Sequence, residues 1–210
     1  MNAILFDLDG VICSTDVLHY RAWKAIADEH GIYFDEAINA RLRGVSRMES
    51  LAIVLERYEG DLSALDLAAM AEKKNGLYRT LLSTMTPADV DPAVLKTLRE
   101  LRHRGYKLAI GSSSKNAGFI LERIALRDAF DAVSDGNNIA KSKPDPEVFL
   151  KAAAMLNERA EDCLVVEDAE AGLVAAHLGG MKAAGIGLAA ASKTADFRLR
   201  CLDELLTLLP

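Results

Sequence analysis

The sequence predicts an α/β fold in which a parallel sheet carries an inserted block of helices. Short apolar runs at about 3–8, 106–111, 131–134, 163–167 and 182–186 alternate with helical stretches, which is the pattern of a parallel α/β sheet. Between about 15 and 81 the strand signal disappears and the spacing of apolar residues becomes helical. A helical block between the first and second strands is expected to be a cap that closes over the crevice of the sheet.

The expected domains are a core formed by residues 1–14 and 82–210 and a helical cap formed by residues 15–81. Pro87 and Pro92 mark the return from the cap to the core. Near the end of the chain, Phe197–Leu199 is expected to form a short edge strand and Leu202–Leu206 a final helix. The cap helices are expected at Val17–Glu29, Asp35–Leu42, Ser46–Tyr58 and Leu67–Ser83, with breaks at Gly31, Gly44 and Gly60.

Composition and charge exclude several classes of protein. The chain has 210 residues, 50% of them hydrophobic, and can therefore bury a substantial core. Its net charge is −6, so no nucleic-acid partner is expected. Cys13, Cys163 and Cys201 are odd in number and form no C-x-x-C pair, which argues against a disulfide framework and a zinc site. Without a signal peptide or a long apolar segment, a soluble, cytoplasmic protein with no membrane contact is expected.

Two carboxylates, Asp7 and Asp9, stand at the end of an apolar run, Met1–Phe6, that is expected to form a buried strand, and they precede Gly10. Side chains alternate along a strand, so residues two apart leave on the same side and bring both carboxylates to one place. Such a pair is costly in an apolar setting unless a cation or a proton intervenes, which favours chemistry or metal binding. For an isolated match, a solvated turn punctuated by Asp-Gly is the alternative interpretation.

Three further segments along the chain carry polar groups suited to a phosphate or metal site. They are Ser112–Asn116 after the second apolar run, Lys143 before Pro144, and Glu167-Asp168 after the fourth run. In open parallel sheets the ligand crevice lies outside the carboxyl ends of the strands, so such groups can converge there.

Two of these segments also have a structural interpretation. Asp168 can cap a helix that begins near Ala169, because aspartate is favoured at that position. Lys143 can be a solvated loop lysine before a helix that Asp145 caps, with Pro146 at its first position.

The order of the motifs resembles the haloacid dehalogenase superfamily of phosphotransferases. The matching motifs are D-x-D-G-V at Asp7–Val11, a strand followed by Ser112, Lys143-Pro144, and a strand followed by Glu167-Asp168. The chain is also similar to the β-phosphoglucomutase branch of that superfamily over nearly its whole length. The residues that carry this closer likeness are His19, Trp23, Arg43, Gly44, Val45, Ser46, Arg47, Ser50, Lys74, Asn75, Ser114, Lys115 and Asn116.

The resemblance implies an enzyme with a Rossmann-like core and one Mg²⁺ per subunit. Asp7 would be the nucleophile that forms an aspartyl phosphate, and Asp9 the general acid and base. Ser112 and Lys143 would stabilise the transferring phosphoryl group. The expected ligands of Mg²⁺, a hard cation that prefers oxygen, are Asp7, the backbone carbonyl of Asp9, Glu167 and Asp168.

The resemblance also implies a second phosphate pocket away from Asp7. Ser46-Arg47-Met48-Glu49 fits a capping box and puts Arg47 in the first turn of a helix, where a guanidinium beside free N–H groups can receive a phosphate. Ser114, Lys115 and Asn116 open another helix and add donors from the core side. The alternative is a surface Arg and Lys at ordinary helix starts.

His19 and Trp23 are four residues apart and share a face of the first cap helix. His19 would contact Asp9 or the substrate, and Trp23 would lie against the sugar; the alternative places both in the core or at its rim. For Ser50 and Lys74 the alternative is a solvated helix face. The full set of expected substrate contacts is Asp9, Trp23, Gly44, Val45, Ser46, Arg47, Ser50, Lys74, Ser113, Ser114, Lys115 and Asn116.

The implied reaction interconverts β-D-glucose 1-phosphate and glucose 6-phosphate, with glucose 1,6-bisphosphate as intermediate and activator. A small-molecule sugar phosphate is therefore the expected partner, and a monomer is expected. Arg43 stands where the branch usually has Lys, and Cys13-Ser14-Thr15 and Ser113 also depart from its pattern. A sugar-phosphate phosphatase of the same superfamily is the first alternative. A catalytically silent sensor is the second, against which the retention of Asp7, Asp9, Lys143 and Asp168 argues.

Overall fold

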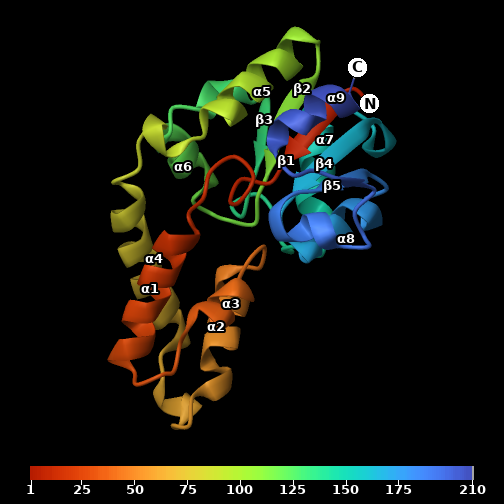
Figure 1. The fold of residues 1–210 in the computed structure, drawn as a ribbon. Helices are drawn as coiled ribbons and strands as arrows, with labels where there is room; N and C mark the ends of the chain where they lie inside the picture. The colour runs from red at the N-terminus through yellow and green to blue at the C-terminus, as the bar shows by residue number, and fades with distance from the viewer. Residues whose placement is uncertain (210) are drawn as a thin grey trace.

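The computed structural model describes residues 1–209 and contains one parallel sheet with strand order β3-β2-β1-β4-β5-β6 (Figure 1). The prediction of an α/β fold is confirmed, including the short edge strand near the end of the chain. The strands are β1 (Ala3–Phe6), β2 (Lys107–Gly111), β3 (Ala132–Ser134), β4 (Cys163–Glu167), β5 (Lys182–Gly185) and β6 (Phe197–Arg198).

Strand β1 lies in the middle of the sheet and is buried on both faces. Its four residues have no exposed surface, and Ile4 pairs with Leu108 of β2 and Leu164 of β4. The chain builds the sheet outward from β1, first toward β3 and then toward β6. The order of the strands therefore reverses beside β1 and β4, and a crevice forms at the carboxyl ends of such strands.

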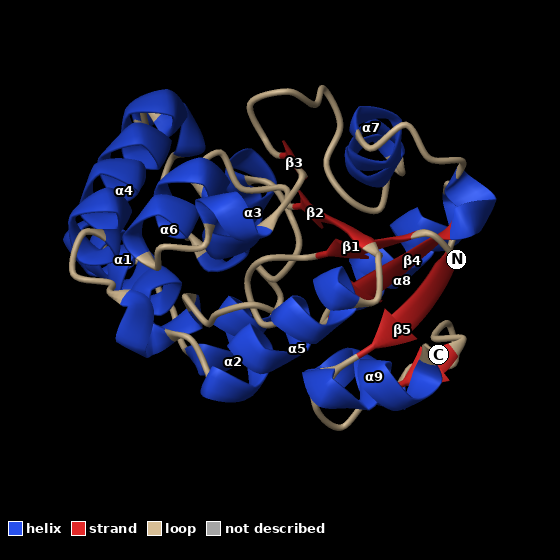
Figure 2. Cartoon of the chain, turned by 90° about the horizontal axis from the view of Figure 1, so that it is seen from above, coloured by secondary structure: helices blue, strands red, loops and turns tan. Residues whose placement is uncertain are grey.

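Helices cover both faces of the sheet, and β1 alternates between them. Ile4 and Phe6 pack with α5 (Pro92–His103), α6 (Ala117–Arg123) and α9 (Leu205–Leu208). Ala3 and Leu5 pack with α7 (Glu147–Met155) and α8 (Glu170–Leu178). Figure 2 shows α7 on one side of the sheet, with α5 and α9 on the other. The last helix begins later than predicted, because Leu202–Glu204 forms a 3₁₀ turn before it.

A helical region formed by α1 (Asp16–Glu29), α2 (Glu36–Ala40), α3 (Arg47–Val54) and α4 (Leu67–Leu82) lies between β1 and α5 in the sequence. Figure 1 shows α1 and α4 side by side, with α2 and α3 beside them. This region has an apolar cluster of its own, which includes Trp23, Ile26, Phe34, Leu51 and Met70. The predicted helices are present, although α3 ends at Val54 and continues as a 3₁₀ turn.

Short 3₁₀ turns connect many of these elements. They are Leu55–Arg57, Leu62–Ala64, Pro87–Asp89, Arg127–Ala129, Ala160–Asp162 and Gly187–Ala191. None of the helices within residues 1–209 combines the length and the apolar character needed to cross a bilayer.

Candidate active site

A cavity of about 1360 Å³ lies at the carboxyl ends of the strands and is also lined by the helical region. It brings together residues that are far apart in the sequence, as the switch in strand order requires. Most of the predicted site residues line it. They are Asp7, Asp9, His19, Gly44, Val45, Ser46, Arg47, Ser50, Lys74, Ser112, Ser113, Ser114, Lys115, Asn116 and Asp168.

Lys143 is buried beside the cavity and binds two carboxylates. Its side chain is 0% exposed, and its ammonium donates to Asp7 Oδ1 at 2.5 Å and to Glu167 Oε1. Burial works against the charge of Lys143, but the two carboxylates outweigh it and hold the pKa of the ammonium above its ordinary value. The interpretation of Lys143 as a solvated loop residue is therefore wrong.

Asp7, Glu167 and Asp168 form an acidic cluster at the ends of β1 and β4. One oxygen from each lies within 4.8 Å of the others. Burial and the charges of Asp7 and Glu167 raise the pKa of Asp168 to about 8, and burial raises that of Glu167 to about 7. Lys143 pairs with only two of these three carboxylates, Asp7 and Glu167, so a further positive charge is favoured here. An oxygen-rich cluster of this kind fits a hard divalent cation such as Mg²⁺.

Two glycines leave room for this cluster. Gly10 has φ +87°, and a Cβ on it would lie 2.2 Å from Asp168 Oδ2. A Cβ on Gly172 would lie 2.0 Å from Cδ of Glu167. Any larger residue at either place would displace a carboxylate of the cluster, so the local backbone is shaped around these two acids.

Asp9 lies in the turn after β1, which ends at Phe6 as the apolar run Met1–Phe6 predicts. The alternation of side chains along a strand therefore does not extend to Asp9. Its carboxylate accepts hydrogen bonds from the backbone N–H of Thr15 at 2.6 Å and from the Thr15 hydroxyl at 2.5 Å. Burial raises the pKa of Asp9 to about 6, although the two bonds from Thr15 oppose that rise.

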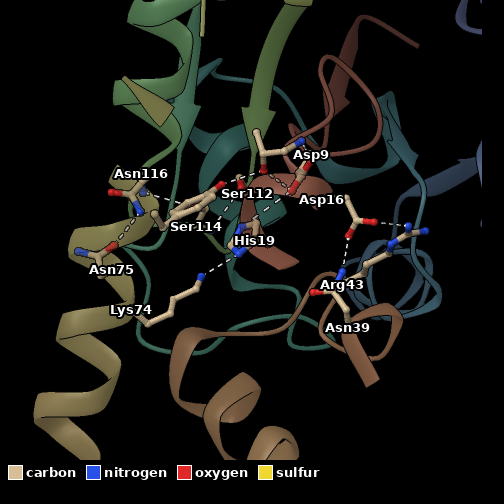
Figure 3. A network of polar contacts seen from close by, with 12 residues as sticks. Asp9, Asp16, His19, Asn39, Arg43, Lys74, Asn75, Ser112, Ser114 and Asn116 are labelled. Atoms are coloured by element: carbon tan, nitrogen blue, oxygen red, sulfur yellow. Dashed lines mark hydrogen bonds and ion pairs between the residues drawn. The ribbon is translucent and has the colours of Figure 1, made fainter. Parts of the chain in front are cut away.

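His19 and Lys74 form a polar pair on the helical side of the cavity (Figure 3). Lys74 Nζ lies 2.8 Å from His19 Nδ1, and His19 Nε2 lies 4.0 Å from Asp9 Oδ2. Burial and the charge of Lys74 hold the pKa of His19 well below its usual value. Lys74 is only 3% exposed, and burial together with the charge of Arg47 lowers its pKa to about 7. The interpretation of Lys74 as part of a solvated helix face is therefore wrong.

The predicted capping box at the start of α3 is present. The Ser46 hydroxyl accepts from the N–H of Glu49, and the Glu49 carboxylate accepts from the N–H of Ser46. Arg47 therefore lies in the first turn of α3, where its guanidinium is 3.1 Å from Glu72. Ser50, one turn further along, is buried and also lines the cavity.

The segment from Ser112 to Asn116 connects β2 to α6 and lines the cavity from the sheet side. Ser112 is buried, and its hydroxyl accepts from the N–H of Ser114 at 3.2 Å. Asn116 occupies the N-cap position of α6 and binds the helical region, because its Nδ2 donates to Asn75 at 3.0 Å. Figure 3 shows this contact. The Lys115 side chain is exposed at the cavity.

Three sequence-based interpretations differ from the structure. Trp23 is 1% exposed, does not line the cavity, and packs in the apolar cluster of the helical region, with the Lys74 ammonium 4.9 Å from its ring. Asp168 does not cap α8, since the N-cap position is Ala169 and has no side-chain cap. Pro146 occupies the N-cap position of α7, and Glu147 is the first helical residue.

Sequence reasoning missed several polar residues of the site. Thr15 and Tyr78 are linked to Asp9, while Asp16 accepts hydrogen bonds from Arg43 at 2.8 Å and from Asn39 at 3.1 Å. Figure 3 shows Asp16 between Arg43 and Asn39. In the sequence, Thr15 belongs to a segment that departs from the pattern of the β-phosphoglucomutase branch. No motif near Tyr78 predicts its role, because its contact with Thr15 depends on how α4 packs.

The family model of the haloacid dehalogenase-like hydrolases matches residues 1–180 of this chain. The chain belongs to this family. As a haloacid dehalogenase-like protein it has the acidic cluster and the buried Lys143 on the parallel sheet, with the helical region across the cavity from them.

Individual relatives within the family have two kinds of activity. The chain is 42% identical over 207 residues to a β-phosphoglucomutase from Bacillus subtilis, with 98% of this chain and 92% of that one covered. It is 30% identical over 185 residues to a phosphorylated carbohydrates phosphatase from Thermotoga maritima, with 87% and 83% covered. The crystal structure of a β-phosphoglucomutase from Clostridium difficile matches with a TM-score of 0.89 at 35% identity, covering 98% of this chain and 93% of that one.

Proposed function

We propose that this protein is a β-phosphoglucomutase, which interconverts β-D-glucose 1-phosphate and glucose 6-phosphate through glucose 1,6-bisphosphate. The observation that carries the proposal is that one cavity has two dissimilar sides. The sheet supplies the acidic cluster around Asp7, and the helical region supplies Arg47 and Lys74. A second phosphate requires such cationic donors away from the reacting one. The 42% identity to the B. subtilis mutase supports the same assignment.

Asp7 is the nucleophile in this proposal. Its carboxylate oxygen attacks phosphorus and forms an aspartyl phosphate, which divides one difficult transfer into two easier ones. Lys143 holds Asp7 in place and neutralises part of the charge that opposes the approach of an anionic phosphate. Ser112, which follows β2, would donate to the phosphoryl oxygens.

One Mg²⁺ would be held by the carboxylates of Asp7, Glu167 and Asp168 and by the backbone carbonyl of Asp9. When bound, the cation supplies positive charge that offsets repulsion between the nucleophile and the phosphate and stabilises the charge of the transition state.

Asp9 is the proposed general acid and base. In one direction it gives its proton to the sugar oxygen that leaves phosphorus, and in the other it takes a proton from the sugar hydroxyl that attacks the aspartyl phosphate. A pKa near 6 suits both roles, because each protonation state is accessible near neutral pH.

The far side of the cavity would hold the phosphate that is not reacting. Arg47, in the first turn of α3, lines the cavity, as do Ser114, Lys115 and Asn116, and the N–H groups of a helix start would add to a phosphate site there. A bisphosphate that turns round places either phosphate at Asp7 and the other at these donors. The helical region would also exclude water, which otherwise hydrolyses the aspartyl phosphate.

A sugar-phosphate phosphatase with the same nucleophile is the second candidate. The 30% identity to the T. maritima phosphatase favours it. In that case water takes the place of the sugar hydroxyl in the second half of the reaction.

An assay with β-glucose 1-phosphate, Mg²⁺ and catalytic glucose 1,6-bisphosphate separates the two candidates. We expect glucose 6-phosphate to accumulate with little free phosphate. Free phosphate without isomer would reject the mutase assignment in favour of the phosphatase.

A further inference from the structure

Tyr78 is connected to Asp9 through a single side chain. The Tyr78 hydroxyl lies 2.8 Å from Thr15 Oγ1, which in turn lies 2.5 Å from Asp9 Oδ2. Tyr78 is 1% exposed and Thr15 is 0% exposed, so both hydroxyls are shielded from bulk water. Three polar groups, from the turn after β1, the start of α1 and the last turns of α4, thus form one buried series.

The direction of these hydrogen bonds follows from the chemistry of the groups. An ionised Asp9 carboxylate can only accept, so the Thr15 hydroxyl donates its proton to Asp9. The oxygen of Thr15 is then left to accept, and the Tyr78 O–H donates to it. A hydroxyl that accepts one hydrogen bond becomes a better donor in the next, so Tyr78 strengthens the bond from Thr15 to Asp9.

Thr15 serves this series rather than its own helix. It occupies the N-cap position of α1, where a threonine hydroxyl ordinarily accepts from a free backbone N–H, but it makes no side-chain cap. Its hydroxyl is instead bonded to Asp9 and Tyr78. The Thr15 side chain therefore orients the Asp9 carboxylate rather than capping α1.

The series also joins the two connections between the sheet and the helical region. Thr15 immediately precedes α1, and Tyr78 lies one turn before the end of α4 at Leu82. The orientation of the Asp9 carboxylate is therefore set by both connections, although Asp9 itself belongs to the turn after β1.

We propose that Tyr78 is a positioning residue, which acts through the Thr15 hydroxyl to hold the Asp9 carboxylate in the orientation for proton transfer. This inference rests on the acid and base role of Asp9 in the proposed function. In the first half of the reaction, a bond forms between Asp7 and phosphorus, the bond from phosphorus to the sugar oxygen breaks, and the proton of Asp9 moves to that oxygen. Only the last event uses the Asp9 carboxylate.

A phosphate donor whose leaving group needs no proton separates these events. Acetyl phosphate releases acetate, a weak base with a pKa similar to that of a carboxylic side chain, and therefore gains little from a general acid. Phosphorylation of Asp7 by acetyl phosphate reports on the nucleophile and its neighbours, whereas turnover of a sugar phosphate reports on Asp9 as well.

The variant Tyr78→Phe removes the hydroxyl and keeps the ring, which lies against the His19 ring with centroids 4.0 Å apart. We expect kcat with sugar phosphate to fall about tenfold, a part of the 10² to 10⁴ that general acid–base catalysis supplies, while KM changes less than about twofold. The rate of Asp7 phosphorylation by acetyl phosphate should stay unchanged. A matched control is Tyr20→Phe, which removes a hydroxyl from another ring of the helical region, stacked on Phe34, and should leave both rates unchanged.

A double-mutant cycle tests whether Tyr78 acts through Thr15. If it does, Tyr78→Phe should add nothing to Thr15→Val, because the hydroxyl on which it acts is already gone. Equal losses of both rates in Tyr78→Phe, no loss in either, or additive losses in the double variant would overturn the proposal.

A failure of the positioning role of Tyr78 can be distinguished from a failure of the proposed mutase function. The wild-type products, isomer or free phosphate, decide between mutase and phosphatase. The ratio of Tyr78→Phe to wild type tests the positioning role with whichever product forms, since Asp9 protonates the leaving sugar oxygen in both reactions. A wild-type protein that is phosphorylated by acetyl phosphate but turns over no sugar phosphate would reject both.

Discussion

The buried ammonium of Lys143 donates a hydrogen bond to the carboxylate of Asp7 at 2.5 Å. It also binds Glu167, so that a single cation balances part of the negative charge at the ends of β1 and β4. A buried charge without a partner is far more costly than a paired one. Lys143 therefore holds the carboxylate of Asp7, the proposed nucleophile, and offsets part of the charge of the cluster.

Replacing Lys143 with Met should destabilise the protein by about 3 kcal/mol, the cost of breaking a buried ion pair by removing one partner. Added Mg²⁺ should restore part of this loss, because it brings positive charge to the same carboxylates. The check is the free energy of unfolding in urea, with and without Mg²⁺. Lys141→Met is the control, since the side chain of Lys141 is 75% exposed; equal stability of the two variants without Mg²⁺ would contradict the role given to Lys143.

Binding of Mg²⁺ should weaken as the pH falls from 8 to 6. Burial and neighbouring carboxylates raise the pKa of Asp168 to about 8, so below that pH the group carries a proton that the cation has to displace. For one displaced proton the apparent affinity falls about tenfold per pH unit. Calorimetric titration at pH 8, 7 and 6 measures this slope. Asp168→Asn should bind Mg²⁺ weakly and with a smaller slope, and a wild-type affinity that does not change with pH would exclude proton displacement.

The acidic cluster could be predicted from sequence because it depends on topology. Asp7 and Glu167-Asp168 follow buried apolar strands, and parallel neighbours end at the same edge of the sheet. The capping box at Ser46 could be predicted for a similar reason, since all its partners lie within four residues.

Other parts of the site depend on contacts between distant elements and could not be predicted locally. Trp23 has the spacing of a cavity residue, but the helical region needs an aromatic side chain for its own apolar cluster. Lys74 has the pattern of a solvated lysine and is buried against the rings of Tyr78 and Trp23, at 4.4 and 4.9 Å. The packing of α1 on α4 decides whether Trp23 and Lys74 are buried or exposed. This packing joins residues about 50 positions apart, so a local sequence pattern does not show it.

The burial of Lys74 should be visible in the dependence of stability on pH. Its pKa is about 7 in the folded protein, where burial and Arg47 disfavour the charge, and about 10.4 when unfolded. Below pH 7 both states are protonated and the full cost of the buried charge is present. Between pH 7 and 10.4 the unfolded state binds more protons, so Lys74 contributes a rise in stability of up to about 1.4 kcal/mol per pH unit.

The variant Lys74→Met has no buried charge at this position. Its free energy of unfolding should therefore lack the rise between pH 7 and 10.4 that Lys74 contributes in the wild type. The difference in free energy of unfolding between variant and wild type should favour the variant most at pH 7 and shrink toward pH 9.5, as measured by urea unfolding at several pH values. Lys73→Met, at the neighbouring exposed lysine that binds Glu29, should show a difference that stays small throughout. A constant difference for Lys74→Met would mean that Lys74 keeps its ordinary pKa.

Arg47 should decide how much substrate is isomerised rather than hydrolysed. If its guanidinium binds the non-reacting phosphate, Arg47→Ala should raise KM at least tenfold, since a charge-assisted contact is lost. It should also raise the share of free phosphate, because a bisphosphate held at one end escapes and leaves the aspartyl phosphate to water. Simultaneous measurement of glucose 6-phosphate and phosphate tests both effects. Arg41→Ala, which breaks an exposed ion pair with Glu56, should change neither, and wild-type kinetics in Arg47→Ala would place the second phosphate elsewhere.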